Sequence, residues 1–467
     1  MRTTRIGAHV IVVVFMLAVA APVAWSAYYG AEPDFLKGLD ASGLKLQDTA
    51  HIAAIPDIMG EGIFRSIEYL YDISFSPDGS WIAFVLDAIP DKGRMHRYYV
   101  YLVQRDGSQR TMTLTTKIGP ALSRSFAWSG GSTPVICSPD YGSDIDRHSE
   151  QPAVTGASIH IKGTDPVLSP SGRQVVFRQG DEYEASLWVA DVAGDAPPRL
   201  VVDKASPYGE LHWSADEQRI AYLAPCSVME GHSLWSVVPG EAPQELLSEP
   251  LLRYEWSPTG TGIAVISDAG ELSLIEPEGE GQIIARNVRD FTWAATGKRI
   301  GYIASPPDQP AESAYVWDAH ADESWRVFES RNPEGWDFST LRFSPDGNRV
   351  YTRGAAGRDV SGDGKYFDRS DRVLLGATVG PSFEPMEAPI AGSVQQPAVC
   401  DGGRLMVVTV EYAGTSSLWC VDMYTGRAAN LGALPVRKYA YGLTWSHDGQ
   451  ALAFEDEGNL MLTQFAR

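Results

Sequence analysis

The stretch Leu341-Arg342-Phe343-Ser344-Pro345-Asp346-Gly347-Asn348-Arg349-Val350-Tyr351 contains a pattern that recurs along the chain. Two runs of β-forming residues flank Ser-Pro-Asp-Gly. In this turn Pro presets φ, Asp bonds back to the backbone and Gly tolerates a positive φ. A tight turn between two extended runs predicts a short β-hairpin. A near-copy occupies residues 73–82.

Seven weaker copies of the turn complete a set of nine repeats. Their Ser-equivalent positions are Ser76, Ser129, Ser169, Ser214, Ser257, Ala294, Ser344, Cys400 and Ser446. The intervals between them are 53, 40, 45, 43, 37, 50, 56 and 46 residues, about 46 on average. Four β-type runs per repeat of this length are typical of a propeller blade. The sequence therefore predicts an all-β fold, a single β-propeller of four-stranded antiparallel blades. The copies at Ser129 and Cys400 are weak, so the expected number of blades is eight or nine.

The last repeat ends after its third strand, so its fourth strand is expected from elsewhere in the chain. Residues 51–55 and 63–67 are the two candidates, and either would remove an exposed edge strand by closing the ring. Most of the 13 Trp stand at equivalent repeat positions, which favours packing between blades over ligand stacking.

The N-terminal region divides into two segments before the propeller. Residues 1–26 combine Arg2 and Arg5, an apolar run and small residues near Ser26, which predicts a signal peptide cleaved after Ser26. The alternative is an uncleaved anchor, because residues 6–25 nearly reach the roughly 20 residues of a membrane span. Residues 27–60 are expected to form a tether that can also lend a strand, and residues 61–467 the propeller.

Both readings of the N-terminal segment place the rest of the chain in the periplasm or outside the cell. An uncleaved segment would anchor it to the inner membrane, and membrane contact is expected only in that case. A monomer is expected.

Charge and cysteine content exclude some functions. The formal net charge is −21, from 38 basic and 59 acidic residues, and such a surface would repel nucleic acid. Cys137, Cys226, Cys400 and Cys420 lack the spacing of a metal site. We expect them to be small core residues, with Cys400 and Cys420 as the first disulfide pair to examine.

The nine turns resemble the TolB-type propeller repeat, a relative of the Trp-Asp repeat. This repeat occurs in TolB and in the propellers of prolyl-oligopeptidase-like peptidases. The resemblance covers about residues 63–467 and implies the fold. TolB adds an α/β domain for which this sequence offers no segment. The peptidases add an α/β-hydrolase domain, and the sequence contains no Gly-x-Ser-x-Gly elbow. The resemblance therefore assigns neither a TolB function nor a peptidase activity to any residue of this sequence.

Insertions between second and third strands predict a binding face. They occupy residues 87–97, 138–156, 224–232, 305–313 and 354–370, and in a propeller these connections emerge on one face. The alternative is that the loops vary freely and bind nothing. The polar and aromatic candidates for ligand contact are Arg94, His96, Tyr141, Arg147, His148, His232, Tyr366 and Phe367.

Residues 359–371 predict a Ca²⁺ site. Asp359, Ser361 and Asp363 supply oxygen donors at positions 1, 3 and 5 of a loop, followed by Gly364 and the carbonyl of Lys365. The segment resembles the Asp-x-Asn-x-Asp-Gly calcium loops of exported repeat proteins.

The loop departs from that pattern at position 12. Ser370 stands there in place of a bidentate Glu, so Asp368 or Asp371 would have to complete the shell. The ion would be structural. A solvated acidic loop without metal is the alternative.

Two functions remain open. The first is an exported non-enzymatic scaffold that binds a protein or an envelope polymer through loops on one face. It is favoured because no His-Glu-x-x-His, Walker loop or dinucleotide fingerprint is present. The alternative is a propeller hydrolase or lyase acting on a sugar or peptide at a calcium-shaped central site. Charged residues and His converging at the centre of the ring would favour the enzyme.

Overall fold

β-Strands make up most of the residues that the computed structural model describes. The described residues are 45–54, 64–90, 96–108, 110–115, 126–138, 159–180, 183–193, 196–225, 231–260, 262–276, 281–305, 311–330, 338–365, 370–380, 385–399, 404–434, 440–447, 449–457 and 459–466. Over these ranges, no helix is long and apolar enough to cross a membrane. The predicted signal segment, residues 1–26, lies outside them.

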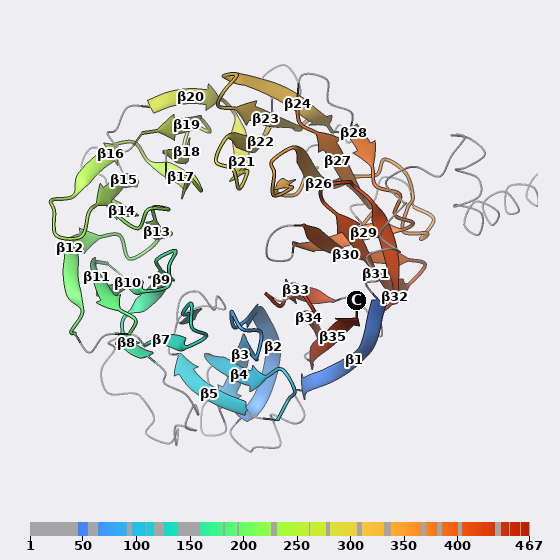
Figure 1. Cartoon of the computed structure of the whole chain (residues 1–467), viewed down its shortest axis with the longest axis horizontal. Coiled ribbons are helices and arrows are strands. Elements are labelled where there is room, and N and C mark those ends of the chain that lie inside the picture. Colours follow the sequence, from blue (N-terminus) through green and yellow to red (C-terminus); the bar gives the residue numbers. More distant parts are fainter. Residues whose placement is uncertain are drawn as a thin grey trace, which may run out of the picture.

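The strands form nine sheets arranged as the blades of a ring (Figure 1). From the centre outward, blades 1 to 3 consist of β2 (Phe64–Phe75), β3 (Trp81–Pro90), β4 (Arg97–Gln104) and β5 (Arg110–Thr115); β6 (Phe126–Trp128), β7 (Pro134–Ser138) and β8 (Ile159–Lys162); and β9 (Thr164–Leu168), β10 (Gln174–Gly180), β11 (Ala185–Asp191) and β12 (Arg199–Ala205).

Blades 4 to 6 follow in the same order. They consist of β13 (His212–Trp213), β14 (Ile220–Pro225), β15 (His232–Val237) and β16 (Gln244–Leu247); β17 (Leu251–Trp256), β18 (Ile263–Ser267), β19 (Leu272–Ile275) and β20 (Gly281–Ala285); and β21 (Val288–Trp293), β22 (Arg299–Ala304), β23 (Ser313–Asp318) and β24 (Glu323–Glu329).

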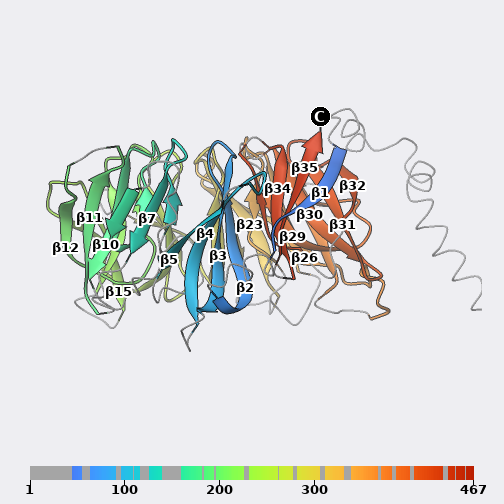
Figure 2. The same cartoon turned by 90° about the horizontal axis from the view of Figure 1, so that it is seen from below.

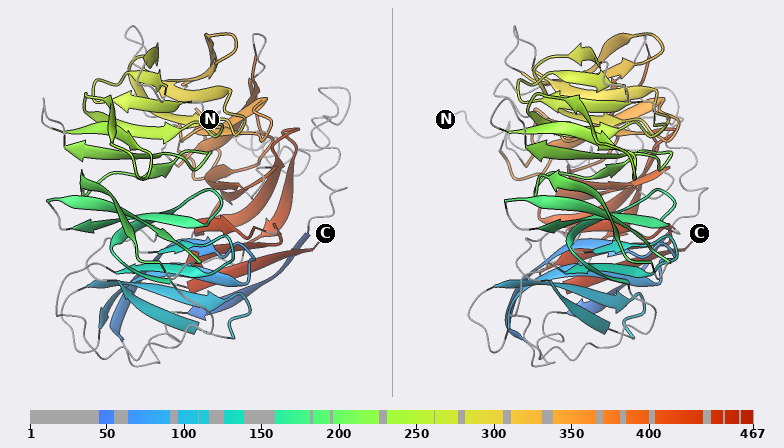
Figure 3. Two further views of the ribbon diagram at one scale, coloured as in Figure 1. Left: turned by 60° about the vertical axis from the view of Figure 1, so that its left-hand side comes forward. Right: turned by 90° about the vertical axis from the view of Figure 1, so that its left-hand side faces the viewer.

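Blades 7 to 9 complete the ring. They consist of β25 (Arg342–Phe343), β26 (Arg349–Ala355), β27 (Arg372–Thr378) and β28 (Pro385–Glu387); β29 (Ser393–Val399), β30 (Leu405–Tyr412), β31 (Thr415–Asp422) and β32 (Ala428–Ala433); and β33 (Tyr441–Trp445), β34 (Ala451–Asp456), β35 (Asn459–Ala466) and β1 (Lys45–Ala54). Seen from the side, the ring is a disc whose blades pack face to face (Figures 2 and 3).

The predicted propeller is confirmed, and the number of blades is nine. The weak turn at Ser129 joins β6 to β7, and residues 400–403 connect β29 to β30, so both weak repeats form blades. Blade 2 departs from the expected pattern, since it has three described strands and β7 pairs with β8 in parallel. A parallel neighbour requires a long crossover, and the predicted insertion at residues 138–156 lies between these two strands.

The two ends of the described chain meet in blade 9. Strand β1 pairs antiparallel with β35 from Lys45 opposite Ala466 to Ala54 opposite Asn459. The closing strand thus includes most of the first predicted candidate, residues 51–55, and lies within the segment predicted as a tether. The second candidate, residues 63–67, instead falls largely in β2 of blade 1. The Thr444 hydroxyl of β33 also donates to the Ile73 carbonyl of β2 at 2.9 Å, joining blade 9 to blade 1.

The repeated turns are built on a buried serine. In blade 7 the Ser344 hydroxyl donates to Asp346 Oδ1 at 2.6 Å and accepts from the Arg349 amide at 2.9 Å, and Ser344 is fully buried. Gly347 donates to the Ser344 carbonyl at 2.8 Å and has φ of 69°. Ser76 and Ser214 make the same pair of bonds. These contacts explain why Ser, Asp and Gly recur at fixed offsets.

The core lies between the blades. All five side chains of β18 are buried, because a second strand is covered on both faces by neighbouring blades. The outer strand β20, by contrast, is largely exposed. Burying one Ile or Val side chain is worth about 1.5–3 kcal/mol, so these continuous apolar runs stabilise each blade contact.

Buried tryptophans connect consecutive blades, as the sequence predicts. Three of them donate an indole N–H to a carbonyl on the innermost strand of the preceding blade. The pairs are Trp213 to Val167 at 3.0 Å, Trp293 to Glu255 at 3.2 Å and Trp445 to Ala398 at 3.2 Å. Cys137 is likewise a buried core residue, and so is Cys420. Cys226 and Cys400 are not among the described residues, so their pairing is untested.

Replacing Ser344 by Ala should lower the free energy of unfolding by about 1–3 kcal/mol, because it leaves the buried Arg349 amide without its hydroxyl acceptor. Chemical denaturation would measure the loss. Ser273→Ala is a matched control, since the Ser273 hydroxyl has no partner in the described chain; a loss as large as that of Ser344→Ala would contradict the prediction.

The turn aspartates should make stability depend on acid pH. Burial by itself would raise the pKa of Asp78, but hydrogen bonds from Ser76 and Ser80 outweigh it and lower the pKa to about 2. Aspartate in the unfolded chain has a pKa of about 3.9. At pH values above this, the ionised Asp78 carboxylate stabilises the folded state, and this contribution is lost as the pH falls toward 2.

Asp78→Asn should therefore show a flatter dependence of melting temperature on pH between 4 and 2 than the unmodified chain. Asp268→Asn, which changes an exposed aspartate outside the repeated turns, should leave the slope unchanged. Parallel pH curves for Asp78→Asn and the unmodified chain would disprove the assignment.

Candidate functional site

One face of the ring collects the connections that carry the sequence candidates. In the blades of four antiparallel strands, second-to-third connections and blade-to-blade connections emerge on one face, which we call the connection face; the repeated turns lie on the other. His96 precedes β4 in blade 1, and His232 begins β15 in blade 4. These two predicted residues therefore share a face but lie in separate blades.

The remaining predicted ligand contacts are untested. Those outside the described ranges are Arg94, Tyr141, Arg147, His148, Tyr366 and Phe367. His96 bonds through Nδ1 to Asp87 Oδ1 at 2.9 Å.

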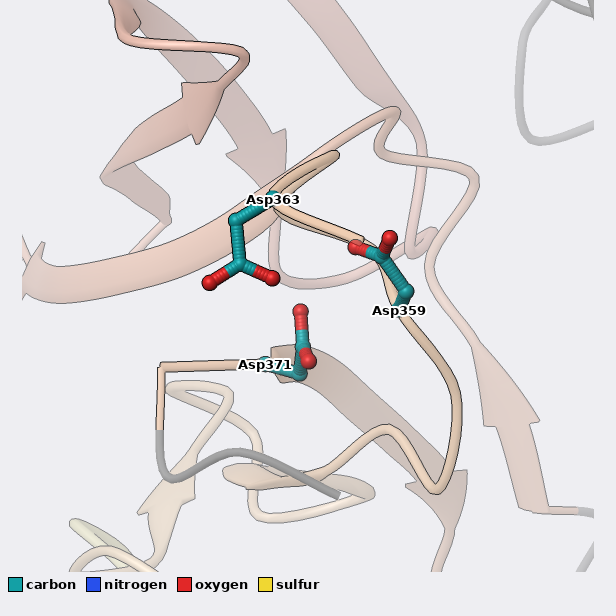
Figure 4. A group of neighbouring side chains, drawn as sticks. All are labelled: Asp359, Asp363 and Asp371. Atoms are coloured by element: carbon teal, nitrogen blue, oxygen red, sulfur yellow. The ribbon is translucent and has the colours of Figure 1, made fainter. Parts of the chain in front are cut away.

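Three of the predicted metal ligands come together between β26 and β27 of blade 7. Ligand atoms of Asp359, Asp363 and Asp371 all lie within 4.8 Å of one another, and their side chains point toward a common space (Figure 4). Ser361 is buried beside them, and its hydroxyl lies 3.5 Å from Asp359 Oδ1. Asp371, which directly precedes β27, is thus the third carboxylate of the group. Asp368 is not among the described residues.

Backbone amides hold these carboxylates in place. Asp359 accepts hydrogen bonds from Gly362 at 2.7 Å and Gly364 at 2.9 Å, and both glycines have positive φ, 78° and 84°. The amide of Lys365 and then its ammonium lower the pKa of Asp363, which stays ionised.

A cavity opens on the connection face between blades 5 and 6. Its volume is about 350 Å³, within the range of small-molecule sites. Eight residues line it: Ala269, Glu271, Ala285, Arg286, Asn287, Tyr302, Ala304 and Tyr315.

Aromatic and charged side chains supply the chemistry of this cavity. The rings of Tyr302 and Tyr315 are stacked, with centroids 5.1 Å apart and planes 11° apart. Arg286 Nε donates to Glu271 Oε1 at 2.7 Å. Burial raises the pKa of Tyr302, so its hydroxyl stays neutral. The cavity therefore offers an aromatic wall beside an ion pair of no net charge.

The innermost strands surround the centre of the ring (Figure 1), and a second polar group lies on these strands and the segments leading into them. In blades 1 and 3 to 7 a charged residue or a threonine stands three positions before the end of the innermost strand: Asp72, Asp165, Glu210, Arg253, Asp290 and Thr340. Several of them connect neighbouring blades. Arg253 forms an ion pair with Asp290 of the next blade, and Thr340 donates to Asp290 Oδ2 at 2.8 Å.

Glu210 of this central group and Glu255 of the next blade have pKa values shifted in opposite directions. A hydrogen bond with His212, 3.0 Å away, lowers the pKa of Glu210. Burial raises the pKa of Glu255 despite the nearby charges of Arg253 and His212. Two carboxyls with opposite shifts beside one histidine could serve in acid–base chemistry.

The sequence analysis missed the cavity and the central group. The cavity is assembled from two blades, and its tyrosines stand where other repeats carry core residues. A signal for the central group does exist in the sequence, namely the charged residue three positions before Trp213, Trp256 and Trp293.

Comparison with known proteins identifies distant structural neighbours. No family model and no curated protein matches this chain. Among solved structures, the tricorn protease is 11% identical with a TM-score of 0.43, and the match covers 85% of this chain but only 42% of the protease. The chain thus spans less than half of that protein.

A TolB structure and an oligogalacturonate lyase structure are two further distant neighbours. TolB from Acinetobacter baumannii is 18% identical, with 62% of this chain and 80% of TolB covered and a TM-score of 0.31. An oligogalacturonate lyase in complex with manganese is 12% identical, with 91% and 96% covered and a TM-score of 0.43. These neighbours differ in function, and no sequence family is assigned.

Proposed function

We propose that this protein is an exported, non-enzymatic β-propeller that binds an envelope polymer through its connection face, with a sugar unit held between blades 5 and 6. The observation that carries the proposal is the cavity of about 350 Å³ on that face. Export is supported by the signal-like sequence of residues 1–26.

The lining of the cavity favours a neutral sugar over an ionic ligand. Glu271 and Arg286 neutralise each other at 2.7 Å, so the site has no surplus charge to attract an ion. Together they still offer acceptors and donors for neighbouring hydroxyl groups. The half-buried Tyr315, supported from behind by Tyr302, gives a flat apolar surface for the C–H face of a sugar ring.

Removing the aromatic wall should weaken sugar binding. Tyr315→Ala is expected to raise the Kd for neutral envelope oligosaccharides roughly tenfold, equivalent to about 1.4 kcal/mol. Glu271→Ala and Arg286→Ala should also weaken binding. Isothermal titration calorimetry of the full chain against a panel of neutral oligosaccharides would measure these effects.

Matched controls are available on other blades. Tyr424→Ala removes an exposed tyrosine of blade 8, and Arg404→Ala breaks the ion pair of an exposed arginine with Asp422 of the same blade. Both should bind like the unmodified chain. Unchanged affinity in Tyr315→Ala would contradict the proposed site. Failure to bind any oligosaccharide, together with recovery of one protein by crosslinking, would favour a protein ligand.

A hydrolase or lyase acting on a sugar or peptide is the second candidate. The central group favours it, because Glu255 has a raised pKa while Glu210 bonded to His212 has a lowered one. Glu255 would then act as the general acid and Glu210 with His212 as the base.

The enzyme candidate predicts turnover that depends on Glu255. Incubation with oligosaccharides and peptides should release new products, and Glu255→Gln should reduce the rate at least 100-fold, as expected on loss of a general acid. Mass spectrometry would detect the products. Their absence with the unmodified chain would exclude this candidate for the substrates tested, as would full activity in Glu255→Gln.

A further inference from the structure

The acidic loop of blade 7 contains a carboxylate oxygen that is buried without a partner. Asp371 is only 1% exposed. Its Oδ1 accepts hydrogen bonds from the amides of Val360 and Ser361, both at 2.9 Å. Its Oδ2 is buried and has no hydrogen-bond partner in the described chain. Burying such an oxygen is destabilising unless another group binds it.

This oxygen belongs to a group of like charges. The Asp371 carboxyl points toward the space that Asp359 and Asp363 also face (Figure 4). Carboxylates this close repel one another. The ammonium of Lys365 lies 3.2 Å from Asp363 Oδ2, but its side chain is 70% exposed and supplies one positive charge against three negative ones. A divalent cation would balance the remainder and satisfy the buried oxygen.

We propose that Asp359, Asp363 and Asp371 bind one Ca²⁺ ion. The Ser361 hydroxyl, 3.5 Å from Asp359 Oδ1, stands beside them as a further oxygen donor, and the loop pattern of the sequence adds the Lys365 carbonyl. The three carboxylates and these neighbours offer oxygen only, which suits a hard cation. Ca²⁺ tolerates an irregular shell of six to eight oxygens, whereas Mg²⁺ demands a near-ideal octahedron. An irregular loop with one rigid and two more exposed carboxylates therefore fits Ca²⁺.

The ion would fasten blade 7 to blade 8. The Ser361 carbonyl accepts a hydrogen bond from the Ala413 amide at 2.8 Å, and Ala413 lies in the turn between β30 and β31 of blade 8. A Cβ atom added to Gly362 would come within 3.2 Å of the Tyr412 ring, so the loop packs closely on that turn. Ca²⁺ would thus stabilise the contact between two blades. This role is independent of sugar binding between blades 5 and 6.

Calcium titration of the full chain tests the site directly. Adding CaCl₂ to the EGTA-treated protein should raise the melting temperature and saturate with a Kd of about 0.1–1 mM, the range of extracellular calcium modules. Calorimetry should give one site per chain. Asp371→Asn keeps an acceptor for the Val360 and Ser361 amides, and it should weaken Ca²⁺ binding at least tenfold.

Asp363→Asn provides a second variant that changes an exposed side chain and leaves the buried loop intact. It should also weaken Ca²⁺ binding at least tenfold, whereas Asp268→Asn on blade 5 should bind like the unmodified chain. A melting temperature that does not respond to CaCl₂ would overturn the site. Equal affinity in Asp363→Asn, or an equal response to MgCl₂, would overturn the ligand assignment or the choice of ion.

Discussion

Pairing of β1 with β35 is the interaction on which the rest of the structure depends. Each blade buries its apolar faces against two neighbours, so an open ring would expose one face at each end and leave an unpaired edge in blade 9. The strand from residues 45–54 covers the edge of β35 and joins the two ends of the described chain. The contacts of blades 5 with 6 and of 7 with 8, which form the proposed sites, require neighbours held in this closed arrangement.

Repeated and unrepeated contacts have different roles in this ring. The serine turns use the same hydrogen bonds in blade after blade, and they lie on the face opposite the connections. Apart from the repeated tryptophan bonds, polar contacts between blades differ from one junction to another. Arg178 donates to the Gly209 carbonyl between blades 3 and 4, whereas Arg253 pairs with Asp290 between blades 5 and 6. This variation allows the junction between blades 5 and 6 to hold an open cavity.

The connection face is where the chain is free to diverge. The turn face is constrained, because a buried serine hydroxyl and a glycine with positive φ leave few alternatives. Connections between second and third strands need only span the gap between adjacent strands. Blade 7 uses this freedom for the acidic loop, and the Glu271–Arg286 pair of the cavity also lies in connections on this face.

The features that could be predicted from the sequence alone depend on local interactions. The hairpin turns, the strand runs and the aromatic packing positions follow from hydrogen bonds and burial within a few residues, so the propeller was predictable. Asp359, Asp363 and Asp371 were also identifiable, because one short loop brings them together. Tertiary structure alone decided the register of β1 on β35, the parallel pairing of β7 with β8, and the cavity between blades 5 and 6. Those features join residues from distant parts of the chain, and only the packing of one blade on the next determines which side chains meet.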